Sequence, residues 1–175
     1  MFNLFKPKMS YEDFGYNYGD SILLTFVDGL VKSHVGWIGR PMDTERLGRS
    51  LAILGVGTFQ IRMFEAIKGE DEQGRATGGL LMRLTERYDN FAFDPSSLSE
   101  LDAFMAAAGE DLSNPHKTRT FPTLVPLVLS KVAGIGQDDP HWATAHQAIS
   151  VFIDSLLDGA RLAYDTTKKN FRLVV

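Results

Sequence analysis

The segment DDPHWATAHQAISVFIDSLLDGARLAYD, residues 138–165, carries the most regular apolar pattern of the chain. Apolar residues recur in it every three or four positions, which places them on one side of an α-helix. This stripe consists of Trp142, Ala145, Ile149, Phe152, Ile153, Leu156, Ala160 and Ala163. Pro140 suits the first turn, where the N–H that proline lacks would have no partner in the helix. We therefore predict a long helix whose apolar side packs against the rest of the protein.

Two of the four histidines lie in the same segment, but their spacing argues against a metal site. His141 and His146 are five residues apart, so their side chains diverge by roughly 140° around a regular helix. The zinc-binding pattern H-E-x-x-H and the di-iron pattern Glu-x-x-His are both absent from the chain. We interpret His146 as a packed or boundary histidine, and we predict no metal ligands.

Two apolar residues of this helix, Val151 and Leu162, lie away from the stripe, roughly opposite Trp142. Either the helix is buried on two sides, or these residues belong to an interface with a partner. Arg161 follows Asp158 by three positions and precedes Asp165 by four, the spacing of ion pairs on a helix surface. We interpret this polar flank as a solvated face.

Other segments have helical spacing as well. Asp43 or Thr44 can cap a second long helix over residues 43–68, and Ser10 can cap a first helix that Gly15 and Gly19 keep short. Further helical segments are expected within residues 22–38, 80–88, 94–109 and 121–134, with a strand as the minor alternative for residues 22–38 because of their β-branched and aromatic content. The sequence therefore predicts an all-α fold, a single domain over residues 1–175 built as a bundle of about five to seven helices.

Composition limits the classes of function. The 175 residues are 44% hydrophobic and 23% charged, as in an ordinary globular domain. The net charge of −4 argues against binding to nucleic acid, which needs a basic surface. Cysteine is absent, which excludes disulfides, thiolate metal sites and a cysteine nucleophile. We see no signal peptide and no apolar run near the roughly 20 residues of a membrane span, and we expect a soluble cytoplasmic protein.

The stretch GEDEQGRATGG, residues 69–79, is polar and rich in glycine, and we predict a loop there. Backbone N–H groups at Gly78 and Gly79, beside Arg75, are candidates for binding an anion at the start of the following helix. We favour a flexible surface loop over this site. With His146, these residues are the predicted ligand-binding residues.

The stretch YEDFGYNYGD, residues 11–20, concentrates aromatic residues that are typical of binding surfaces. Its tyrosines, Tyr11, Tyr16 and Tyr18, together with Val151 and Leu162, are the predicted interface residues. The alternative, which we favour for the tyrosines, is an aromatic lid that closes one end of the bundle.

No catalytic motif is present, so we lean towards a non-enzymatic protein that acts by protein–protein interaction or self-association, with no cofactor. Contact of the basic and aromatic chain ends with a membrane surface is a weaker possibility. The alternative is an enzyme or small-ligand-binding protein with a carboxylate and histidine pocket formed between helices. A pocket that holds His146 or His116 beside two acids, under the 74–79 segment, would favour this alternative.

Overall fold

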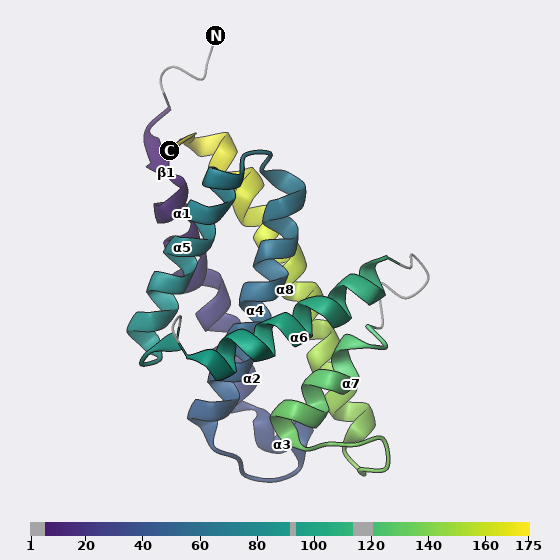
Figure 1. The fold of residues 1–175 in the computed structure, drawn as a ribbon. Coiled ribbons are helices and arrows are strands. Elements are labelled where there is room, and N and C mark those ends of the chain that lie inside the picture. Colours follow the sequence, from purple (N-terminus) through teal and green to yellow (C-terminus); the bar gives the residue numbers. More distant parts are fainter. Residues whose placement is uncertain (1–5, 92–93, 114–120) are drawn as a thin grey trace.

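The computed structural model of the protein describes residues 6–91, 94–113 and 121–175 (Figure 1). These residues form a bundle of helices with one pair of short strands, which confirms the predicted all-α fold. The α-helices are α1 (Tyr11–Tyr18), α2 (Leu24–Lys32), α3 (His34–Ile38), α4 (Thr44–Ala66), α5 (Glu70–Arg87), α6 (Pro95–Leu112), α7 (Leu124–Val128) and α8 (Trp142–Asn170). Two π-helical turns, η2 (Gly19–Leu23) and η4 (Leu129–Ala133), extend α1 and α7. Among the described helices, none combines the length and the apolar character needed to cross a membrane.

The long helices α4 and α8 lie against each other in the core of the bundle. The Asp43 carboxylate caps α4, as predicted, by accepting the N–H groups of Glu45 and Arg46 at 3.0 and 3.2 Å. α4 also contacts α2, α5 and α6, and its middle is buried on nearly every side. α8 buries Ala145, Ile149, Phe152, Ile153, Leu156, Leu157, Ala160 and Tyr164. The predicted stripe is therefore confirmed, with Trp142 and Ala163 half-buried at its edge.

The N-terminal helix is longer than predicted, because α1, η2 and α2 follow one another without a break. Ser10 starts it as expected: its hydroxyl accepts the N–H of Asp13 at 2.9 Å, and the Asp13 carboxylate accepts the N–H of Ser10 in return. Gly15 and Gly19 do not end the helix. Instead, Gly19 opens the π-helical turn η2, which joins α1 to α2.

Residues Glu70–Arg87 form one helix, α5, so the loop predicted over residues 69–79 is wrong. Gly69 is the N-cap of this helix, and three acids, Glu70, Asp71 and Glu72, occupy its first turn. Negative charges stabilise this end of a helix, where the N–H groups point outward. The polar composition of the segment therefore belongs to a helix start.

One glycine on each helix, Gly15 of α1 and Gly79 of α5, allows α1 and α5 to lie close together. A Cβ atom on Gly79 would overlap the carbonyl oxygen of Glu12, and a Cβ atom on Gly15 would overlap that of Ala76. Glycine inside a helix costs about 1 kcal/mol relative to alanine. Here the two helix backbones touch, and the packing they gain offsets that cost.

Two features outside the main helices complete the architecture. Strand β1 (Lys8–Ser10) pairs in parallel with β2 (Arg172–Val174), so the segments before α1 and after α8 meet at one end of the molecule (Figure 1). The fully buried Asp111 of α6 caps α7, since its carboxylate accepts the N–H groups of Thr123 and Leu124 at 3.1 and 2.9 Å. The sequence predicted neither feature.

Candidate anion-binding pocket

The residues predicted to bind a ligand are each engaged locally. Arg75 forms an ion pair with Asp71 at 3.0 Å, one turn earlier on α5. Gly78 and Gly79 lie inside α5, so the turn with free N–H groups on which the predicted anion site depended is absent there. His146 packs on the ring of Trp142, with ring centres 5.6 Å apart. No hydrogen bond, ion pair or ring contact joins His146 to the α5 residues within the described parts of the chain.

The predicted interface residues divide into two groups. Tyr18 is only 2% exposed and packs on Phe59 with ring centres 4.7 Å apart, so its prediction as a surface residue is wrong. Tyr11 and Tyr16 are half-buried, and the Tyr16 hydroxyl donates to Glu86 of α5 at 2.8 Å. These tyrosines thus serve packing within the molecule, although Tyr11 and Tyr16 keep an exposed part.

Val151 and Leu162 form the second group, because they remain at the surface. Their exposed fractions are 57% and 68%, so α8 is not buried on two sides. Leu162 also lines an apolar hollow of about 490 Å³ between the N-terminal helices and α8, together with Ile22 and the partly exposed Phe26. Their role in an interface stays a prediction.

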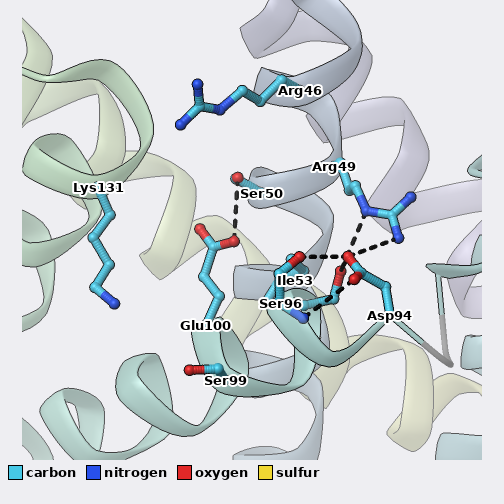
Figure 2. A pocket seen from close by; sticks show the side chains of 10 residues that line it. Arg46, Arg49, Ser50, Ile53, Asp94, Ser96, Ser99, Glu100 and Lys131 are labelled. Atoms are coloured by element: carbon cyan, nitrogen blue, oxygen red, sulfur yellow. Dashed lines mark hydrogen bonds and ion pairs between the residues drawn. The ribbon is translucent and has the colours of Figure 1, made fainter.

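A polar pocket of about 420 Å³ lies between α4, the first turns of α6 and η4 (Figure 2). It is lined by Arg46, Arg49, Ser50, Ile53, Asp94, Ser96, Ser97, Ser99, Glu100 and Lys131. The lining combines three cations, two carboxylates and four hydroxyl groups. On one side of the pocket these groups form hydrogen bonds and an ion pair with one another, and on the other side most of them do not.

One side of the pocket is a closed network around Asp94. This residue caps α6 and accepts the hydroxyl groups of Ser96 and Ser97 at 2.6 and 2.9 Å. Arg49 pairs with the same carboxylate at 3.3 Å and donates to the carbonyl oxygen of Asp89 at 2.8 Å. The serine hydroxyls, the Ser96 N–H and then Arg49 lower the pKa of Asp94 to about 2. This side is therefore a fixed, ionised wall.

The other side of the pocket contains two cations without such partners. Within residues 6–91, 94–113 and 121–175, the side chains of Arg46 and Lys131 form no hydrogen bond or ion pair. Arg46 lines the pocket from α4 and Lys131 lines it from η4, on different sides of the Glu100 carboxylate of α6 (Figure 2). Both side chains belong to exposed residues, so they are accessible to a molecule from solution.

Glu100 does not neutralise these two cations. Its carboxylate accepts the hydroxyl of Ser50 at 3.4 Å. Burial raises the pKa of Glu100, and this effect outweighs the lowering by Ser50, Lys131 and Arg46. A close ion pair would have lowered the pKa instead. With Arg49 and Asp94 paired to each other, Arg46, Lys131 and Glu100 leave this side with one net positive charge.

The backbone fixes the positions of these side chains. Arg46 and Ser50 are one turn apart on α4 and so share a face. Lys131 lies in the π-helical turn η4, and Arg40 holds the end of that turn by donating to the carbonyl oxygens of Ala133 and Gly134. π-Helical turns are rare and often occur at functional sites. The positive end of the α6 dipole adds to the field of the cations.

Sequence reasoning missed this pocket, because its residues come from three separate stretches, around 46–53, 94–100 and 131. The one local signal is DPSSLSE, residues 94–100, in which three serines accompany two acids at a helix start. That pattern explains the cap of α6 without a ligand, so it does not identify a site.

Metal binding and known relatives give no further guide. Among the described side chains, no group of three histidine, aspartate or glutamate residues could hold a metal ion.

His116, named in the predicted pocket, lies outside the described residues. Comparison with protein-family models, curated proteins and solved structures gave no match.

Proposed function

We propose that this protein binds a small molecule with an anionic group, a phosphate or a carboxylate, in the pocket between α4, α6 and η4. The observation that carries the proposal is that Arg46 and Lys131 line one pocket from different helices, and that their side chains have no hydrogen-bond or ion-pair partner among the described residues. Hydrogen bonds between such cations and an anion are about twice as strong as those between neutral groups. The arginine guanidinium can also donate two parallel hydrogen bonds to two oxygens of either a carboxylate or a phosphate.

The fixed side of the pocket supports the same function. Arg49 and Asp94 hold each other and the first turn of α6 in place, so little order has to be created when a ligand enters. Binding is stronger when the groups that receive the ligand are already arranged. The net positive charge of the open side favours an anion over a cation.

The proposal is tested by titrating the isotope-labelled protein with ethyl phosphate and following backbone amide shifts by NMR at low salt. Low salt matters because exposed charges are screened over about 10 Å at 0.1 M. We expect shifts around residues 46–53, 94–100 and 131. Arg46→Gln and Lys131→Gln should each weaken binding about five- to tenfold, since each removes one charge-assisted contact.

Arg75→Gln is the matched control, because Arg75 is a half-exposed arginine of α5 that pairs only with its own helix. It should leave the affinity for ethyl phosphate unchanged. If Arg75→Gln weakened binding as much as Arg46→Gln, the anion would be responding to overall charge and the pocket would not be its site. Absence of any shift near α6 would also contradict the proposal.

A second candidate function, self-association, is favoured by the exposed apolar residues of α8. Val151 and Leu162 are three helical turns apart and within about 20° of the same face. If the α8 helices of two copies packed antiparallel, Val151 of each copy would contact the partner's Leu162. Large exposed apolar residues with this self-complementary spacing suit a symmetric interface.

A further inference from the structure

The position of Glu100 restricts the kind of anion that fits the pocket. One carboxylate oxygen accepts the Ser50 hydroxyl at 3.4 Å. The other oxygen points away from Ser50, into the space between Arg46 and Lys131 (Figure 2). A ligand held by these two cations therefore comes next to a carboxylate oxygen that has room for a hydrogen bond.

An ionised carboxylate can only accept hydrogen bonds. A ligand that offered nothing but anionic oxygens would face Glu100 as a like charge, at a cost in affinity. Burial makes that cost larger, and it already raises the pKa of this carboxyl group. The arrangement is favourable only if the ligand also carries a hydrogen-bond donor close to its anionic group.

The remaining lining indicates a hydroxyl group as that donor. Ser50, which donates to Glu100, and Ser99 line the pocket with Glu100, and their hydroxyl groups can both donate and accept. A ligand with several hydroxyl groups can satisfy these serines and Glu100 together. An ammonium group would satisfy Glu100 alone, since it has no acceptor for the serine hydroxyls.

We propose that the pocket recognises a hydroxylated anion, such as a phosphorylated polyol or a hydroxy acid, whose hydroxyl group donates to Glu100 while its anionic group binds Arg46 and Lys131. This inference rests on the proposed function and names the ligand class for the same site. Glu100 is then the residue that determines specificity.

The test compares two phosphate monoesters of equal charge, ethyl phosphate and glycerol 3-phosphate, which differ in their hydroxyl groups. The measured quantity is the ratio of their dissociation constants, because any general repulsion by Glu100 cancels in it. The wild-type protein should prefer glycerol 3-phosphate roughly tenfold, as expected for one hydrogen bond to a charged group. Glu100→Gln should bring this ratio close to one.

Two further variants separate the donor contact from simple charge. Glu100→Asp keeps the charge but shortens the reach, so the preference should fall while the affinity for ethyl phosphate stays the same. Glu45→Gln removes one negative charge beside Arg46 from outside the pocket lining, and it should leave the tenfold preference intact. Amide spectra of each variant establish that it is folded.

The outcomes distinguish the two proposals. If ethyl phosphate binds but the preference is absent, or is unchanged in Glu100→Gln, the inference about ligand class is wrong and the anion site stands. If O-phosphoethanolamine binds more tightly than glycerol 3-phosphate, the recognised donor is an ammonium group and the hydroxylated class is overturned. If no phosphate monoester binds, the proposed function fails and the inference fails with it.

Discussion

At the scale of single residues, Asp94 both caps α6 and fixes one side of the pocket. Its carboxylate accepts the N–H of Ser96 and the hydroxyl groups of Ser96 and Ser97, and its pKa is lowered to about 2. A lowered pKa in the folded state contributes stability above the ordinary aspartate pKa, and this contribution is lost as the pH falls through the lowered value.

We therefore expect Asp94 to remain ionised at pH 3, where most aspartates have begun to take up a proton. Carboxyl carbon shifts in an NMR titration should give a midpoint near 2. Ser97→Ala removes one of the hydrogen bonds to the charged form, so it should move the midpoint upward. An ordinary midpoint for Asp94 in the wild-type protein would show that the capping network is not formed.

Asp111 performs a different task from within the core. It is fully buried, and its carboxylate accepts the N–H groups of Thr123 and Leu124 at the start of α7. Asp111→Ala would leave the buried N–H of Leu124 and the part-buried N–H of Thr123 without this acceptor, at a cost of about 1–3 kcal/mol. Chemical denaturation should show this loss, whereas Asp102→Ala, at an exposed position of α6, should change stability by less than about 0.5 kcal/mol.

At the scale of helices, the contact between α1 and α5 gives neighbouring glycines opposite roles. A Cβ atom on Gly79 would overlap the backbone of Glu12, whereas one on Gly78 would meet no atom outside its own helix within 4 Å. Gly79→Ala should therefore destabilise the protein by about 1–3 kcal/mol through overpacking. Gly78→Ala should stabilise it by about 0.5–1 kcal/mol, because alanine favours the helix.

Urea denaturation of the two variants measures this difference directly. The midpoint of unfolding should move to lower urea for Gly79→Ala and to higher urea for Gly78→Ala. If both substitutions stabilised the protein, the two backbones could not be in contact as described.

The same contact explains which helices could be predicted from sequence. α4 and α8 repeat their apolar spacing over many turns, so the sequence of each segment alone predicts a helix. α5 does not, because its first turns are polar and contain glycines, and the close contact of Gly79 with Glu12, far away in the sequence, is visible only in the folded chain. Its glycine-rich start therefore resembled a loop. Tyr18 shows a related limit. The polar and glycine residues around it suggested a surface position, but its side chain is buried in the core.

At the scale of the whole molecule, the exposed face of α8 predicts how two copies would associate. Asp158 lies between Val151 and Leu162 on this face, so a symmetric pairing brings like charges together. Salt screens that repulsion, and we expect association to strengthen as ionic strength rises. Sedimentation equilibrium should show a dimer fraction that increases with salt and is lost in Leu162→Ser.

Glu70→Ser provides the control, because this exposed residue belongs to α5 and not to the face of α8 that carries Val151 and Leu162. It should leave the dimer fraction unchanged. A monomer at all salt concentrations in the wild-type protein would contradict self-association without affecting the pocket.

The candidate pocket can be recognised only when the whole fold is known. Arg46, Glu100 and Lys131 each have an ordinary sequence neighbourhood, and they meet because α4, α6 and η4 pack together. No pattern within a short stretch of sequence indicates that these three residues lie close together. The overall class of fold could be predicted from repeated patterns, but a site assembled from single residues of distant helices requires the packing to be known.

The parallel pair of β1 and β2 determines how the molecule would respond to mechanical force. Lys8 is in register with Arg172, and Ser10 with Val174. Pulling on the chain before β1 and after β2 would slide two parallel strands past each other, so their hydrogen bonds would bear the load together and not open one by one. Until these short strands part, the tension bypasses the helices, and the polar pocket keeps its shape.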